Sequence, residues 1–94
     1  MAVVHINFIG PWRVILEVNT VTINITSIDQ ARDYVEANFG PQFEEKLRSM
    51  GAHRKQSIWE NSNILLNGRR ISTSNEVILK EGDRLEVIPK VAGG

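Results

Sequence analysis

The last two residues of this sequence, Gly93 and Gly94, are the ones whose type and position could do chemistry. They end the stretch VIPKVAGG at residues 87–94. Such an ending has two readings. It is a loose chain end, since termini are commonly poorly ordered, or the terminal carboxylate of Gly94 is a reactive group. Residues without side chains can enter a narrow channel and adopt dihedral angles that others avoid. Pro89 would fix the backbone at the base of such a tail.

Other chemistry has little support in the sequence. His5 and His53 lack the spacing of metal ligands, so we expect no metal site. The hydroxyl residues 72–74 have no partner histidine in a recognisable motif, which argues against nucleophilic catalysis. Cysteine is absent, which excludes disulfides and thiolate sites. There is no glycine-rich phosphate loop, so we expect this chain to bind no cofactor and any ATP to be used by a partner.

Composition points to one small domain. The chain has 94 residues, and its 11 basic residues balance its 11 acidic ones. Zero net charge argues against a general nucleic-acid binder. The sequence predicts no signal peptide and no membrane span, so we expect a cytoplasmic protein without nucleic-acid or membrane partners. Two pairs of basic residues, 54–55 and 69–70, are either a site for an acidic partner or solvated surface.

The first half of the chain reads as two strands followed by helix. Residues 2–10 alternate with period two, and residues 13–25 are rich in β-branched side chains, with a bend near 19–20. These segments predict a hairpin. Ser27 and Gln30 have the spacing of a capping box at the start of a main helix. Gly40 would end that helix, and Pro41 would begin a short second helix over residues 41–50.

The second half predicts a loop and three strands. Residues 52–61 lack periodicity and read as loop, with Trp59 over the core. A strand at 64–66, an Asn67-Gly68 turn and a short return strand at 69–71 form a hairpin. A polar loop at 72–76 and a turn at 80–83 precede the last strand, 84–88.

Strand runs on either side of a helix predict an α+β domain of the β-grasp (ubiquitin-like) type. We expect a mixed sheet of four to five strands, with the first and last strands parallel at its centre. One main helix and a short second helix would complete the domain at residues 1–90, followed by a flexible tail at 91–94. The expected core residues are Val4, Ile6, Phe8, Ile28, Ala31, Val35, Leu66, Leu79, Leu85 and Val87.

Alternation in the last strand places Ile88 on the face opposite Leu85 and Val87, together with Leu65 and Val3. Exposed apolar surface of this kind often marks a partner site. The alternative is that the short second helix or the loop at 52–61 covers this face.

Three segments carry a resemblance to a known family: ILLNGRRI at 64–71, LKEGDRLEVIP at 79–89 and VAGG at 91–94. In this order they resemble the MoaD/ThiS-type ubiquitin-like sulfur carriers, and most closely the small subunit of molybdopterin synthase. Two features depart from the family pattern. Lys90 stands where a second proline is frequent, and IGPWRVIL at 9–16 lacks a basic turn motif.

The resemblance implies that a partner enzyme of the ubiquitin-activating type adenylates Gly94 with ATP. The product becomes a thiocarboxylate that donates sulfur in molybdopterin or tungsten-pterin synthesis, with catalysis in the large synthase subunit. Gly93 would pass through the partner's channel. The expected partner-binding residues are Ile88, Leu65, Pro89, Lys90, Val91 and Ala92. The alternatives are a modifier joined to lysines through Gly94, a carrier for thiamine or tRNA thiolation, and an interaction domain with an inert tail.

Overall fold

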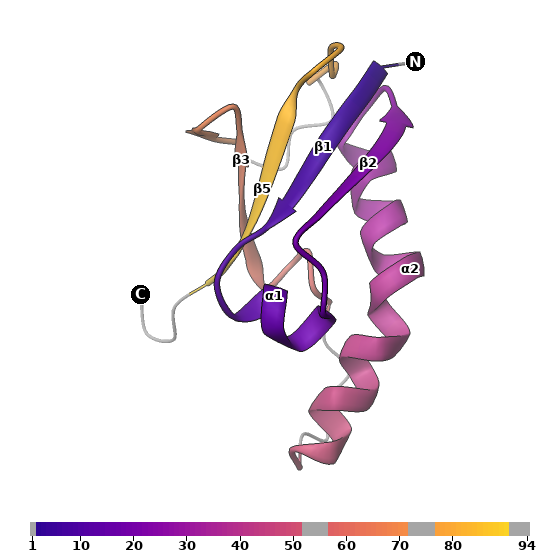
Figure 1. Cartoon of the computed structure of the whole chain (residues 1–94), viewed down its shortest axis with the longest axis vertical. Helices are drawn as coiled ribbons and strands as arrows, with labels where there is room; N and C mark the ends of the chain where they lie inside the picture. The colour runs from indigo at the N-terminus through magenta and orange to yellow at the C-terminus, as the bar shows by residue number, and fades with distance from the viewer. Residues whose placement is uncertain (1, 52–56, 72–76, 91–94) are drawn as a thin grey trace.

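A mixed sheet in the order β2-β1-β5-β3-β4 forms the framework of the molecule. The computed structural model describes residues 2–51, 57–71 and 77–90. Along the chain the elements are β1 (Ala2–Phe8), α1 (Pro11–Leu16), β2 (Thr20–Ile25), α2 (Ile28–Ser49), β3 (Ser62–Leu66), β4 (Arg69–Arg70) and β5 (Arg84–Pro89). The long helix α2 runs beside the sheet, and α1 joins the end of β1 to β2 (Figure 1). The predicted β-grasp fold is confirmed, with five strands, a main helix and a short helix.

The centre of the sheet is the parallel pair of β1 and β5. Its register runs from His5 opposite Arg84 to Phe8 opposite Val87. β2 pairs antiparallel with β1, and β3 pairs antiparallel with β5. The hairpin of the first two strands and the parallel contact of the first and last strands are therefore both as the sequence predicted.

The connection between β1 and β2 corrects one prediction, because residues 11–16 form α1 and not the start of a strand. Gly10 takes a φ of 61°, and Pro11 provides a preset helical φ at the first helical position. Trp12 and Leu16 then lie four residues apart on one helical face and are both buried. Burial of this pair outweighs the strand preference of Val14 and Ile15.

The second correction concerns α2, which continues through Gly40 and Pro41 to Ser49. The predicted short helix at 41–50 is therefore part of α2, and the short helix of the fold is α1. Pro41 lacks the N–H that would bond to the carbonyl four residues earlier. Packing offsets this loss, because Phe43 is buried and its ring meets that of Trp12 edge-on at 5.0 Å.

Both ends of α2 follow sequence signals. The hydroxyl of Ser27 accepts from the Gln30 N–H at 3.2 Å, and the Gln30 carboxamide accepts from the Ser27 N–H at 3.2 Å. The predicted capping box is thus confirmed. Gly51 follows the helix with a φ of 89°, in the left-handed region where glycine is favoured.

Packing of α2 against one face of the sheet forms the core. Of the ten residues predicted to be buried, nine are buried, and Leu66 is only partly buried against the cluster. Leu66 is the last residue of β3 and pairs with Arg69 of the edge strand β4. The other buried apolar residues, which were not among these ten, are Ala2, Trp12, Leu16, Ile25, Phe43, Ile58, Trp59 and Ile64.

Trp12 ties α1 to the start of β3. Its indole N–H donates to the Ser62 hydroxyl at 2.8 Å, and that hydroxyl donates to the Ile58 carbonyl at 2.6 Å. Ser62 is buried, so these bonds satisfy a polar group in the core. The predicted loop at 72–76 and residues 52–56 of the predicted loop at 52–61 lie outside the described residues. Residues 57–61 form no helix or strand, as predicted, and Trp59 is buried as expected. Among the described residues, no helix is both long and apolar enough to cross a bilayer.

Replacing Leu85 with alanine should destabilise the fold by about 2–5 kcal/mol, because its side chain is fully buried at the centre of the sheet. Ile88→Ala is the matched control in the same strand and should cost less, since Ile88 is only half-buried. Urea denaturation measures both free energies of unfolding. A loss below about 0.5 kcal/mol for Leu85→Ala, a value typical of surface positions, would contradict this core.

Candidate functional site

The end of β5 fixes the point from which the C-terminal residues leave the sheet. The Lys90 N–H donates to the Asn61 carbonyl at 2.9 Å, just beyond the last paired residues, Pro89 and Ser62. The N–H groups of even-numbered β5 residues therefore face β3. Pro89 has no backbone N–H, and its nitrogen faces the β1 side of β5, where β1 has already ended at Phe8. Proline thus costs no ladder bond here.

The four residues after Lys90 carry the predicted chemistry. Val91, Ala92, Gly93 and Gly94 lie outside the described residues, so their reactive role and the flexible tail at 91–94 remain predictions. A stretch of four residues spans at most about 13–14 Å when extended.

The sheet face opposite α2 is confirmed to hold Leu65 and Ile88. Leu65 pairs with Glu86 and Asn63 pairs with Ile88, out of phase with the buried Leu85 and Val87. Both Leu65 and Ile88 are half-buried. We call this surface, with Val3 of β1, the outer face.

Neither element that the sequence offered as an alternative cover lies on the outer face in the described part of the chain. Residues 41–49 belong to α2, and their buried member Phe43 joins the core. Ile58 and Trp59 of the 57–61 turn join the same core. The role of Leu65, Ile88, Pro89 and Lys90 as partner-binding residues stays a prediction.

Polar side chains surround the apolar residues of the outer face. His5 Nδ1 lies 2.9 Å from the Thr22 hydroxyl, and the Thr20 hydroxyl donates to the Asn7 carboxamide oxygen at 2.8 Å. Non-obligate interfaces are about as apolar as the rest of a protein surface, so this mixed composition does not by itself identify a partner site. The described residues hold no group of three or more His, Cys, Asp or Glu placed to bind a metal ion.

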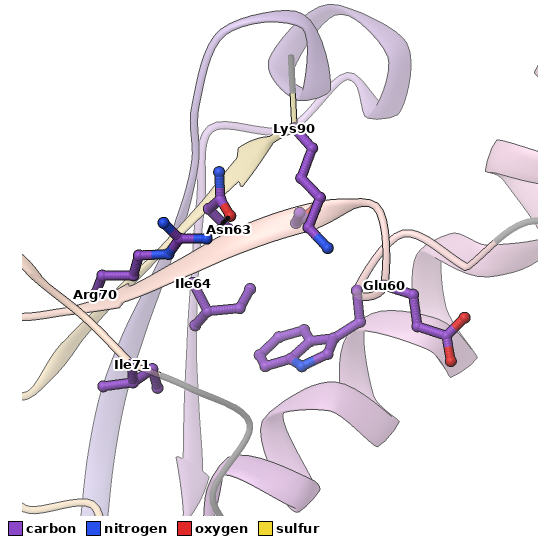
Figure 2. Close-up of a pocket in the computed structure, with 8 residues that line it drawn as sticks. Glu60, Asn63, Ile64, Arg70, Ile71 and Lys90 are labelled. Atoms are coloured by element: carbon purple, nitrogen blue, oxygen red, sulfur yellow. Dashed lines mark hydrogen bonds between the residues drawn. The ribbon is translucent and has the colours of Figure 1, made fainter. Parts of the chain in front are cut away.

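A groove of about 670 Å³ lies beside β3, next to the base of the tail. Its lining residues are Trp59, Glu60, Ser62, Asn63, Ile64, Arg70, Ile71 and Lys90. Figure 2 shows Lys90 reaching over β3 toward Glu60, with Arg70 beside Asn63. Sequence reasoning missed this groove, although it did single out Arg70 as one of a basic pair.

The adjacent arginines of that pair point to opposite faces of the sheet. Arg70 pairs with Leu65 and therefore shares the outer face, where its guanidinium donates to the Asn63 carboxamide oxygen at 3.1 Å. Arg69 pairs with Leu66 and does not line the groove. The other basic pair, residues 54–55, lies outside the described residues.

Two turns at the far end of β5 set the register of β3 and β5. Asn67 and Gly68 form the predicted tight turn, with φ values of 51° and 86°. The Asn67 amide donates to the Asp83 carboxylate at 3.0 Å, and its oxygen accepts from the Arg84 N–H at 2.9 Å. Asp83 also accepts from the Lys80 N–H at 2.7 Å. These bonds hold the strands in the alignment that places Ile88 on the outer face.

Asp83 should make stability depend on pH. The hydrogen bond from the Lys80 backbone, and then that from Asn67, lower the pKa of Asp83 below its usual value. Its contribution is therefore present above the unfolded pKa of about 3.9 and is lost as pH falls through the lower folded pKa. Asp83→Asn should be less stable than the parent at neutral pH, and the difference should shrink in acid. Urea denaturation across pH 2–7 measures it, and a pH-independent difference would contradict the assignment.

A parallel-centred sheet packed on one helix, ending in a strand that leads into the C-terminal residues, defines a ubiquitin-like protein. The sequence profile of the ThiS family matches residues 16–94, and the chain belongs to that family. No curated protein matches the sequence.

Solved structures with the same fold come from bacteria and archaea. One similar chain belongs to a complex of subunits 1 and 2 of molybdopterin-converting factor from Helicobacter pylori 26695. It matches with a TM-score of 0.64 and 22% identity, over 98% of this chain and 99% of that one. A putative subunit 1 of molybdopterin converting factor from Pyrococcus furiosus has a TM-score of 0.66, 20% identity and coverage of 97% and 100%. Small archaeal modifier protein 1 from Methanosarcina acetivorans matches with a TM-score of 0.69 and 20% identity, over 100% of this chain and 98% of that one. The chain thus has the fold of sulfur carriers and small modifiers.

Proposed function

We propose that this protein is a sulfur carrier whose Gly94 carboxyl group becomes a thiocarboxylate and donates sulfur in molybdopterin or tungsten-pterin synthesis. The observation that carries the proposal is the ThiS family match, which extends through the tail to residue 94. Support also comes from β5, which is held on both sides by β1 and β3 and leads directly to the tail. A rigid base of this kind limits where the last residues can reach.

The chemistry explains why activation is needed. A carboxylate is a poor acyl donor because its leaving group would be oxide. A partner adenylyltransferase transfers AMP from ATP to the Gly94 carboxylate and releases pyrophosphate. Sulfide-level sulfur then displaces AMP and leaves the thiocarboxylate. In this scheme the chain supplies only the acyl group, and both the ATP site and the sulfur-transfer site belong to partner proteins.

Partner docking would use the outer face and the base of the tail. Leu65 and Ile88 offer apolar contact beside Pro89 and Lys90, and the tail enters the partner's active site. Four residues alone bury too little surface for stable association, which commonly needs about 800 Å² per partner. One related structure is a complex of two subunits of molybdopterin-converting factor. That precedent supports a large synthase subunit as the second partner.

Ile88→Asp should weaken binding to the large synthase subunit by about tenfold or more, because it places a charge in an apolar contact. The matched control is Val14→Asp, which adds the same charge at a side chain that is 77% exposed on α1. Calorimetric titration gives both affinities. Equal affinities for the parent and Ile88→Asp would remove the outer face from the proposed interface.

Deleting Gly94 should abolish activation, because it moves the carboxylate back by about 3.3–3.6 Å. Misplacement by about 1 Å can cost about a hundredfold in rate. Gly93→Val should also fail, since it adds a branched side chain within the partner's channel. Both variants should keep their thermal stability within about 0.5 kcal/mol. The assay mixes each variant with the host adenylyltransferase, ATP and a sulfur donor and measures thiocarboxylate by mass. Activation of the deleted form at the parent rate would contradict the proposal.

A second candidate is a protein modifier joined to lysines through Gly94. The structural match to small archaeal modifier protein 1 from Methanosarcina acetivorans and the match to its Haloferax volcanii counterpart, with TM-scores of 0.69 and 0.68, favour it. Both schemes begin with adenylation of Gly94. They differ in the group that then displaces AMP, which is sulfide-level sulfur for a carrier and leads to a bond with a lysine for a modifier. Isopeptide-linked adducts in the host, in place of a thiocarboxylate, would identify the modifier.

A further inference from the structure

The groove beside β3 suggests a second binding site, at the edge of the sheet next to the apolar residues of the outer face. We propose that the edge of β3 at Ser62–Ile64 binds an extended, acidic segment of a partner protein as an added strand. This site is independent of the chemistry at Gly94. It rests on three features: an open strand edge, an apolar floor and a basic rim.

Among the described residues, the edge is open at Ser62–Ile64 because β4 is only two residues long. It pairs with Leu65 and Leu66, and the Ile71 N–H makes one further bond to the Ile64 carbonyl at 3.0 Å. The Asn61 carbonyl accepts from Lys90 of the neighbouring β5, so by alternation the polar backbone groups of Ser62 and Ile64 face away from β5. In the described part of the chain, the Ser62 carbonyl and the Ile64 N–H have no backbone partner. An added strand would pair with both groups.

The walls of the groove select the residues of that strand. Ile64, Ile71 and Trp59 form an apolar floor, and the cationic Arg70 and Lys90 lie on the rim with a single carboxylate, Glu60. Neither cation forms an ion pair in the described part of the chain. An extended segment that alternates apolar residues with a carboxylate would fill the floor and reach Arg70. Backbone bonds supply affinity and alternate side chains supply specificity in this mode of recognition.

One wall of the groove is held in place by α2. The Glu36 carboxylate accepts from the Ser57 hydroxyl at 2.6 Å and from the Trp59 N–H at 2.8 Å. Trp59 itself is buried. A wall fixed in advance lowers the entropy cost of binding a peptide.

The other outermost strand, β2, is a poorer candidate. Its exposed side chains are the uncharged Thr20, Thr22 and Asn24. Neither the groove beside β3 nor the hollow lined by Glu17, Gln42, Glu45, Lys46 and Ser49 includes a residue of β2. Charge and shape therefore both favour the β3 edge for an acidic strand.

The test is NMR titration of the full-length, 15N-labelled protein with the capped peptide acetyl-Thr-Val-Glu-Val-Thr-amide. We expect saturable shifts of the amides of residues 62–64 and 70–71, and slower hydrogen exchange of the Ile64 amide. Arg70→Glu should weaken binding by about tenfold, whereas its neighbour Arg69→Glu, also exposed but outside the groove, should change it less than about twofold. The spectra of both variants report whether they are folded.

A charge swap completes the test. The peptide with lysine in place of glutamate should bind the parent weakly and should bind Arg70→Glu better than the parent. Several results would overturn the proposal: no saturable shift, shifts confined to β2 or to Val3, Leu65 and Ile88, or equal effects of the two arginine variants. Concentration-dependent shifts of residues 62–64 without peptide would also overturn it, because a second copy of the chain would then occupy the edge.

Discussion

The parallel pairing of β1 with β5 is the constraint on which the rest of the structure depends. Val4 and Ile6 from one strand and Leu85 and Val87 from the other are all fully buried. Parallel neighbours cannot be joined by a tight turn, so the chain between them must cross the sheet. The helix α2 makes that crossing and covers the four side chains. β5 lies between β1 and β3, and its end is held in a fixed position by the pairing of Pro89 with Ser62 and the bond from Lys90 to Asn61.

That fixed position separates the proposed binding surfaces from the proposed reactive group. Lys90 is anchored to Asn61 at the end of the ladder, and the residues proposed to react come after it. The outer face and the β3 groove both lie next to Lys90, and Lys90 itself is on the rim of the groove. A protein that must present the same tail to an activating enzyme and then to a second partner needs docking surfaces close to the tail. The structure places two candidates there.

Local signals in the sequence were sufficient for much of this fold. The capping box of Ser27 and Gln30, the Asn67-Gly68 turn and the alternation in β1 and β5 each act within a few residues, so sequence alone predicted them. The same alternation placed Leu65 and Ile88 on the outer face. Where the prediction was wrong, distant contacts decided the structure. Residues 11–16 form a helix because Trp12 and Leu16 reach the core, and α2 passes Pro41 because Phe43 packs on Trp12. The groove could not be predicted because residues 59–60, 62–64, 70–71 and 90 meet only in the fold.

The most direct measurement is the intact mass of the protein purified from its own host, followed by sequencing of its C-terminal peptide. A sulfur carrier predicts a fraction of molecules with one sulfur in place of one oxygen, located at Gly94. This fraction should fall when the protein is incubated with the large synthase subunit and its pterin precursor. Protein that carries only an unmodified Gly94 carboxylate under every growth condition, or Gly94 joined to lysines, would contradict the sulfur-carrier function.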